Sequence, residues 1–114
     1  MQNEKGEIIG FTSHYMMKGR FVCKRTNKSG EIKAAWNFLN AFLEDQVHLE
    51  ELVRSSLKDA SDQGADIYMM LDLADNEQAF GPLSFELSPE QLNYFIYNWR
   101  CQPLQSNEIS ANYL

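Results

Sequence analysis

Two histidines and two cysteines are the side chains best suited to metal or nucleophilic chemistry, and they stand far apart in the sequence. His14, Cys23, His48 and Cys101 have no spacing typical of metal ligands. A Ser-His-Asp or Cys-His site stays open, but no nucleophile motif surrounds either histidine. The sequence therefore favours His14 as an ordinary strand residue and His48 as a residue on a helix surface.

Glycine-rich loops that bind phosphate groups are absent from the sequence. Six glycines are present, and no two of them lie within three residues of each other. Neither a P-loop nor a dinucleotide-binding fingerprint fits these glycine spacings, and the two-glycine pyrophosphate loop with which acetyltransferase folds hold coenzyme A does not fit them either. The chain is therefore expected to bind no cofactor and no metal by itself.

The charge of the chain is divided unevenly along its length. Residues 1–34 hold seven Lys or Arg against three Glu, whereas residues 35–114 hold three against thirteen acidic groups. The basic cluster has one aromatic neighbour, Phe21, and belongs to a chain with a net charge of -6, so nucleic-acid binding is disfavoured. The cluster consists of Lys18, Arg20, Lys24, Arg25 and Lys28.

The length and the composition predict one globular domain over residues 1–114. The chain has 44% hydrophobic residues, and no apolar run approaches the roughly 18 residues of a membrane helix. The two cysteines are widely separated and no secretory leader begins the sequence, so a cytoplasmic location without disulfides is expected. Residues 1–6 and 102–110 are expected to be flexible, since a polar tail frays by default.

The first third of the chain predicts β-structure. Residues 7–16 are rich in strand formers and indicate a strand, followed by a turn at Gly19 and a second strand over residues 21–24. A loop over residues 26–30 ends this region. The apolar positions of residues 32–42 fit a strand and a helix equally well, so both alternatives stay open.

The second part of the chain contains the clearest helix signal. Asp45 is a plausible N-cap, Gly64 stands just past the end, and an apolar stripe runs between them, so residues 46–63 are predicted to be helical. Residues 66–73 suit a strand buried on both faces. A brief helix or turn is expected around Ala79, and residues 92–99 alternate like a strand.

Three strings, taken in order, resemble a known family. They are Ile-Lys-Ala-Ala-Trp-Asn-Phe at 32–38, Gly-Ala-Asp-Ile-Tyr followed by Leu-Asp-Leu within 64–73, and Leu-Asn-Tyr-Phe-Ile-Tyr-Asn-Trp-Arg-Cys at 92–101. The order and composition are similar to those of the C-terminal half of N-myristoyltransferase. This resemblance implies an α+β domain with a mixed, mainly antiparallel sheet and one main helix, the acetyltransferase-like (GNAT-like) half of that fold.

The resemblance also implies a function and a set of site residues. The family's C-terminal half supplies most of a groove for a peptide that starts with glycine, and myristoyl-CoA, the co-substrate, is held by a separate N-terminal half. The chain's own terminal carboxylate, here that of Leu114, takes the proton of the glycine amine. Trp36 and Leu92 match groove positions, each with plain core as the alternative. Tyr15, in a strand that matches more loosely, is the third residue expected to contact the peptide.

The partners expected from the resemblance are a glycine-started, basic peptide and a complementing N-terminal half or a second copy of the chain. Two turns depart from the family pattern. Ser-Pro-Glu-Gln at 88–91 replaces Gly-Asp-Gly-Asn, and Met-Lys-Gly-Arg at 17–20 replaces Leu-Pro-Ser-Thr. The loss of two glycines removes backbone freedom near the peptide. A catalytically inactive structural or protein-binding subunit is therefore the alternative function.

Overall fold

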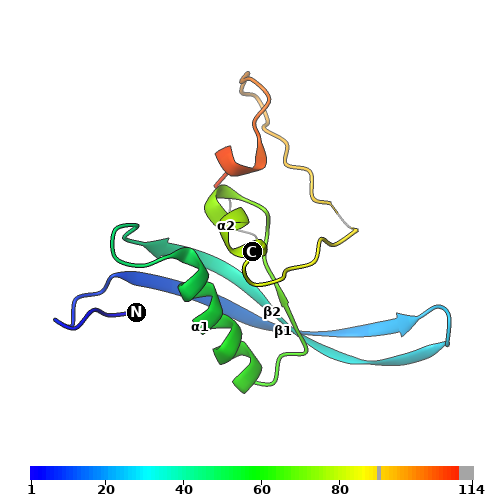
Figure 1. Cartoon of the computed structure of the whole chain (residues 1–114). Coiled ribbons are helices and arrows are strands. Elements are labelled where there is room, and N and C mark those ends of the chain that lie inside the picture. The colour runs from blue at the N-terminus through cyan, green and yellow to red at the C-terminus, as the bar shows by residue number, and fades with distance from the viewer. Residues whose placement is uncertain (90, 111–114) are drawn as a thin grey trace.

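The computed structural model describes residues 1–89 and 91–110, and a long antiparallel hairpin dominates it (Figure 1). The hairpin consists of β1 (Gly10–Cys23) and β2 (Lys28–Phe42), joined by a turn over residues 24–27 in which Asn27 has a φ of 50°. The turn expected at Gly19 is wrong: this glycine lies within β1, pairs with Ile32 and has no positive φ. The loop expected over residues 26–30 is likewise shorter, because Lys28 already pairs with Cys23.

The ambiguous segment 32–42 is a strand, because it pairs along its whole length with β1. Helix α1 (Leu49–Asp62) follows it, and its N-cap is His48 and not Asp45. The helix begins later than predicted because Gln46 and Val47 both donate their backbone N–H groups to the carbonyl of Leu43 in a preceding turn. Its C-terminal end agrees with the prediction, since Gly64 there adopts a φ of 82°.

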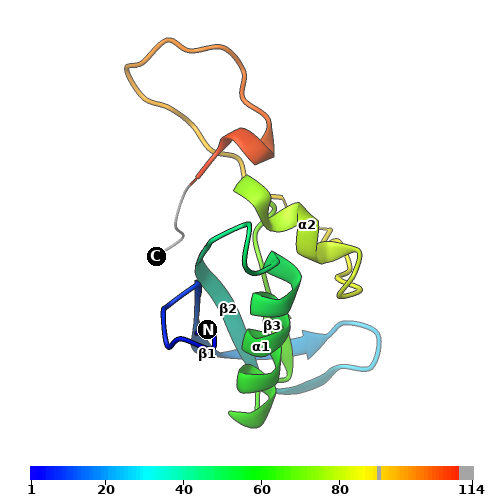
Figure 2. The ribbon, with the colours of Figure 1, turned by 60° about the vertical axis from the view of Figure 1, so that its left-hand side comes forward.

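Helix α1 packs on one face of the hairpin with its predicted apolar stripe (Figure 2). The apolar residues of the stripe recur at intervals of three and four positions, which places their side chains on the same side of the helix. One core cluster joins Leu52 to Ile9 and Val47, and a second joins Leu49 and Val53 to Ala79. Burial of this stripe holds the helix against the sheet.

The third strand, β3 (Ile67–Met69), completes a mixed sheet in the order β1-β2-β3. It runs parallel to β2, and α1 forms the crossover between them, so the expected α+β class with a mixed sheet is confirmed. The strand predicted over residues 66–73 is confirmed only over residues 67–69, and its predicted burial on both faces is wrong. Only residues 34–36 of β2 pair with β3, and Ile67 is 43% exposed.

The remaining elements are short. The turn η1 (Ala74–Asn76) and the helix α2 (Glu77–Phe80) form the brief helical region expected around Ala79. A further turn, η2 (Ser106–Glu108), lies next to η1, where the N–H of Ala74 donates to the carbonyl of Ile109 at 3.0 Å. Within residues 1–89 and 91–110, no helix is long and apolar enough to cross a membrane.

The strand predicted over residues 92–99 is wrong for the described structure. These residues pair with no other strand, and Asn98 takes a φ of 59°, which interrupts an extended chain. A strand pattern is not sufficient for a strand, because the backbone N–H and C=O groups also need a neighbour. The large side chains here are therefore exposed, among them Phe95 at 90% and Tyr97 at 96%.

Candidate functional site

Tyr15 and Trp36, two of the predicted groove residues, lie directly opposite each other on β1 and β2. Residues facing each other across a strand pair project from the same side of the sheet. Their neighbours along the strands, such as His14, project toward α1, where the His14 Nδ1 lies 2.9 Å from the Oγ of Ser56. Tyr15 and Trp36 are therefore on the sheet face turned away from α1, which we call the open face.

The open face is apolar and only partly covered. Tyr15 and Trp36 are half-buried, and the ring of Phe38 meets that of Tyr15 edge-on at 6.3 Å. Around them, large apolar side chains of β1, β2 and β3 remain exposed to solvent: Phe11 at 52%, Met17 at 47%, Leu39 at 42% and Ile67 at 43%. Exposed apolar side chains gathered on one face of a sheet are typical of a binding or docking site.

A β-bulge shapes both faces of the hairpin. Ser13 pairs with Leu39 and His14 pairs with Asn37, so Phe38 is the extra residue. Residues three apart in a regular strand point to opposite faces, but the bulge places Asn37 and Asn40 on the same face, below α1. Their side-chain amides exchange two hydrogen bonds of 3.0 Å.

A buried polar network lies between α1 and the sheet. The Oγ of Ser56, which is 3% exposed, contacts the His14 Nδ1 at 2.9 Å and the Tyr68 hydroxyl at 2.8 Å. The Asn37 amide donates to the same hydroxyl at 3.1 Å. Burial raises the pKa of Tyr68, and the hydrogen bonds with Ser56 and Asn37 oppose part of that effect.

The spatial arrangement of Asp59, His14 and Ser56, with the histidine between the other two, resembles a catalytic triad, but its geometry does not support one. The Asp59 carboxylate lies 3.7 Å from the His14 Nε2, and the Ser56 hydroxyl is enclosed between two polar partners. A nucleophile has to reach its substrate, so the enclosure of Ser56 indicates that this network holds the helix to the sheet. His14 is a strand residue, as predicted, and His48 is exposed at the start of α1.

Sequence reasoning missed this network. The one signal available was a pair of asparagines in a strand pattern, Asn37 and Asn40, since asparagine is depleted in strands. Ser56 gave no signal because its burial depends on the packing of α1 against Tyr68. No group of three or more His, Cys, Asp or Glu in the described ranges could hold a metal ion.

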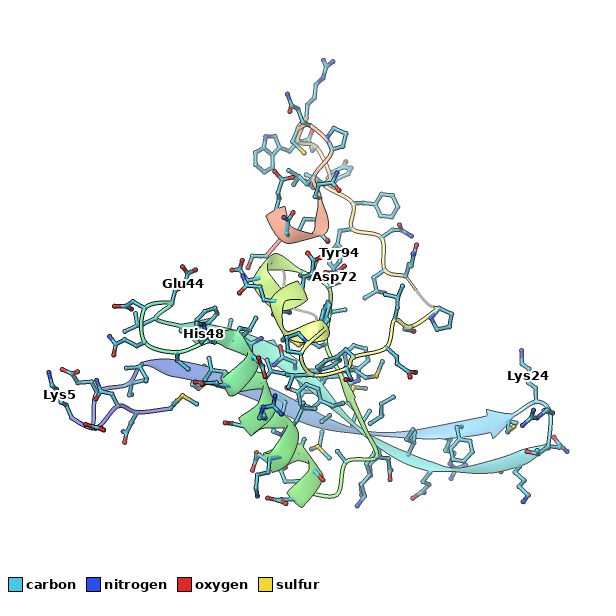
Figure 3. All side chains as sticks on the ribbon, viewed as in Figure 1. Lys5, Lys24, Glu44, His48, Asp72 and Tyr94 are labelled. Carbon is cyan, nitrogen blue, oxygen red and sulfur yellow. The ribbon has the colours of Figure 1, made fainter. Side chains whose placement is uncertain are left out.

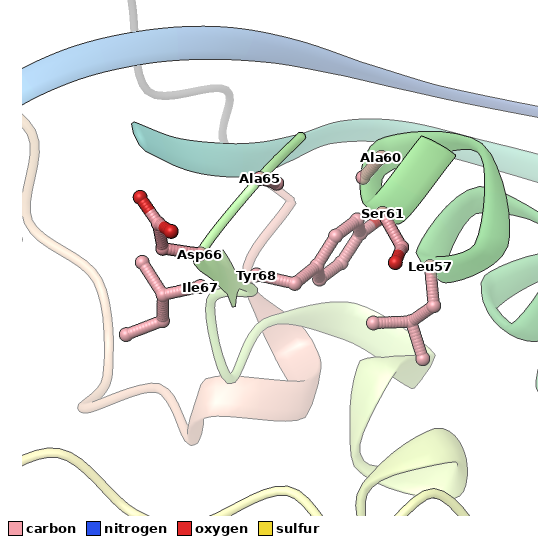
Figure 4. Close-up of a pocket in the computed structure, with 7 residues that line it drawn as sticks. All are labelled: Leu57, Ala60, Ser61, Ala65, Asp66, Ile67 and Tyr68. Carbon is pink, nitrogen blue, oxygen red and sulfur yellow. The ribbon is translucent and has the colours of Figure 1, made fainter. Parts of the chain in front are cut away.

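A shallow hollow lies between the end of α1 and β3 (Figure 4). Its volume is about 180 Å³, and its lining includes Leu57, Ile67, Tyr68 and Asp66. The Asp66 carboxylate accepts the backbone N–H of Lys33 at 2.8 Å, and the N–H of Asp66 donates to the carbonyl of Lys33 at the same distance. The one acidic group of this hollow therefore serves to hold β2 and β3 together.

Of the two remaining predicted site residues, Leu92 does not join this face in the structure. Leu92 lies in the unpaired segment 91–99, outside the three-stranded sheet, and is 51% exposed. Figure 3 shows Tyr94 of the same segment well apart from the hairpin turn at Lys24. Leu114 lies outside the described residues.

This mixed sheet with a helical crossover agrees with the acetyltransferase-like half of a two-part acyltransferase. Residues 1–113 match the family described as "Myristoyl-CoA:protein N-myristoyltransferase, C-terminal domain", and the chain belongs to that family.

Individual relatives agree with the family match. The chain is 32% identical over 108 residues to the glycylpeptide N-tetradecanoyltransferase of Drosophila melanogaster, a stretch that covers 95% of this chain and 22% of the relative. It is 29% identical over 109 residues to glycylpeptide N-tetradecanoyltransferase 2 of Bos taurus and to that of Danio rerio, covering 96% of this chain and 21% of each relative. The chain thus spans about a fifth of the length of these curated relatives.

Proposed function

We propose that this chain is the peptide-recognition half of a protein N-myristoyltransferase and acts in the cytoplasm. It binds the N-terminal glycine of a basic peptide on the open face of its sheet. The observation that supports this most directly is the pairing of Tyr15 with Trp36 on an apolar face, at positions that the family resemblance assigns to the peptide groove. Aromatic side chains are favoured for such contacts because they offer large area at little cost in side-chain entropy.

The co-substrate myristoyl-CoA is held by a separate N-terminal half. The exposed segment 91–99 supports the need for such a partner, since its side chains alternate like those of a strand and its backbone has no strand neighbour among the described residues. A partner that covers this segment would bury Phe95, Tyr97 and Trp99 together. We propose that Leu92 joins the groove only in that assembly.

The chemistry proposed for the site is acyl transfer to an amine. The glycine nitrogen attacks the thioester carbonyl, the new C–N bond forms as the C–S bond breaks, and coenzyme A leaves as its thiol or thiolate. The terminal carboxylate of Leu114 takes the proton that the ammonium group must lose. In water the two pKa values differ by about 4.5 units, so the carboxylate needs a buried site that raises its own pKa and lowers that of the amine.

Calorimetry of the purified chain with glycine-started basic peptides tests this function. Binding that disappears when the same peptides are N-acetylated supports recognition of a free glycine amine. Equal binding of the acetylated peptides contradicts it. No binding of either peptide at millimolar concentration, both with the chain alone and with an acyl-CoA-binding half added, contradicts it as well. Binding that appears only with the added half identifies a groove that needs its partner.

A C-terminal extension tests the role of Leu114. One residue added after Leu114 moves the carboxylate by one position, so acyl transfer in the complemented enzyme should be lost while helix content and unfolding midpoint stay unchanged. Extension of the N-terminus by one residue is the matched control. Unchanged transfer by the C-terminally extended chain would exclude this carboxylate as the base.

A catalytically inactive structural subunit is the second candidate function. It is favoured by the small size of the hollow beside β3, whose volume is only about 180 Å³. The acidic group of this hollow, the Asp66 carboxylate, already accepts a hydrogen bond from the backbone of Lys33. Such a subunit would bind the complementing half stably through segment 91–99 and the open face, without binding peptide. Stable assembly combined with no peptide binding and no transfer would decide for it.

A further inference from the structure

The distal part of the hairpin, residues 18–33, forms a two-stranded arm. Strand β3 pairs only with residues 34–36 of β2, so no third strand of the described ranges supports the arm. Figure 3 shows Lys24 at the end of the hairpin that lies farthest from α1. We call residues 18–33 the basic arm; it takes no part in the function proposed above.

Positive charge is concentrated on this arm. Six of its sixteen residues are Lys or Arg and one is acidic, which gives it a net charge of +5 in a chain of net charge -6. All six cations are exposed, and none takes part in an ion pair with another described residue. The six cations are Lys18, Arg20, Lys24, Arg25, Lys28 and Lys33.

Repulsion between the cations lowers the stability of the folded arm. Lys18 and Lys33 are direct register partners, and like charges facing each other across a strand pair repel. Glu31 faces Arg20 in the register, yet the two form no ion pair. An anionic ligand along the arm would relieve this repulsion, whereas nothing in the described part of the chain does so.

Two apolar side chains accompany the charges at the end of the arm. Phe21 is 46% exposed and Val22 is 64% exposed. As consecutive strand residues they point to opposite faces, so each face of the arm ends in an apolar group beside cations. The Phe21 ring lies over Gly30, where an added Cβ would come within 2.7 Å of its Cε1 atom.

We propose that the basic arm binds the surface of a membrane that contains anionic lipids. The cations contact the lipid phosphate and carboxylate groups, while Phe21 and Val22 enter the boundary between headgroups and acyl chains. Single-stranded nucleic acid fits the arm less well, because such binding relies on several aromatic platforms. Phe21 is the one aromatic residue of the arm, and one side of its ring already covers Gly30.

Vesicle co-sedimentation with the full chain tests the charge requirement. Vesicles of phosphatidylcholine mixed with phosphatidylserine are compared with vesicles of phosphatidylcholine alone, at low and high salt. The chain should bind the anionic vesicles, and salt should weaken binding. The double variant K24Q/R25Q should bind about 25-fold more weakly, since each basic residue near an anionic surface strengthens binding about fivefold.

Matched variants separate the arm from general charge effects. K5Q/R100Q changes the net charge by the same amount at two exposed residues outside the arm, and it should bind like the unchanged chain. Val22→Thr keeps the side-chain shape and should weaken binding, whereas Ile8→Thr, at a residue 72% exposed outside the arm, should not. Circular dichroism of each variant checks that the fold is retained.

Three results would overturn the proposal. They are equal binding to neutral and anionic vesicles, an equal loss of binding in K24Q/R25Q and K5Q/R100Q, and tighter binding of an RNA oligonucleotide than of anionic vesicles at the same phosphate concentration. The last result would assign the arm to nucleic acid instead.

Discussion

The Tyr68 hydroxyl lies 2.8 Å from the Oγ of Ser56, and this contact joins β3 to the middle of α1. The same Oγ meets His14 of β1 at 2.9 Å, so one buried serine connects the helix to both outer strands of the sheet. Since β3 has only three residues, its position depends strongly on such contacts. Trp36 of the open face is the register partner of Met69 on β3. The network that holds β3 in place therefore also sets the position of Met69 beside Trp36.

Replacement of Ser56 by alanine should destabilise the fold. The change leaves the His14 Nδ1 and the Tyr68 hydroxyl without a shared partner in a buried site, which is expected to lower the free energy of unfolding by about 1–3 kcal/mol. Urea unfolding measures the effect. Ser55→Ala, at the exposed neighbouring position of α1, is the matched control and should change stability by less than about 0.5 kcal/mol. Equal effects of the two variants would contradict a structural role for the network.

Tyr68 should make stability fall at alkaline pH. Its pKa in the folded chain is raised by burial above the ordinary value near 10, so the unfolded chain loses this proton first as the pH rises. The contribution of Tyr68 is therefore complete below about pH 10 and is lost above it. Urea unfolding between neutral pH and pH 11 should show this decline, and Tyr68→Phe should show a smaller one. A decline of the same size in Tyr68→Phe would assign it to other groups.

Trp36→Ala should affect peptide binding more than stability. Trp36 is half-buried on the open face, so its truncation is expected to weaken binding of a glycine-started peptide by about 1–2 kcal/mol. Ile8→Ala truncates an apolar side chain that is 72% exposed and lies outside the sheet, and it should leave peptide binding unchanged. Calorimetry and urea unfolding measure the two quantities. A loss of about 3–5 kcal/mol in stability, with unchanged binding, would identify Trp36 as a core residue only.

Cys23 should react with alkylating reagents at lower pH than an ordinary thiol. A hydrogen bond from the Thr26 side chain, with further ones from the backbone of Thr26 and Arg25, lowers the pKa of Cys23. The thiolate is the reactive form, so the pH profile of iodoacetamide labelling should be shifted downward. Mass spectrometry resolves labelling at each cysteine. Thr26→Val should move the Cys23 profile upward; an unchanged profile would mean that this hydrogen bond does not control the thiol.

The success of the sequence predictions depended on whether their signals were local. Helix α1 was predicted nearly in full, because its apolar stripe and Gly64 act within a few turns of chain. Segment 32–42 stayed ambiguous, since its apolar positions satisfy both periods, and pairing with β1 decided for a strand. Gly19 predicts a turn because a glycine permits one, yet its pairing with Ile32 keeps it within the strand.

The strand expected over residues 92–99 shows the limit of local pattern most clearly. Its alternating aromatic residues have high strand propensity, but propensity acts only where a neighbouring strand is available. Among the described residues no such neighbour is present, and the side chains are exposed. The placement of Leu92 relative to Trp36 therefore could not be derived from the sequence.

The sequence by itself determined the family, the α+β class, the main helix and the basic cluster, because motif order, apolar periodicity and charge are written along the chain. Only the tertiary structure decided which residues share a face. The bulge at Phe38 placed Asn37 and Asn40 together below α1 and left Tyr15 and Trp36 on the open face. The physical reason is that register depends on hydrogen bonds between residues far apart in sequence, and a shift of one residue reverses every side chain of a strand.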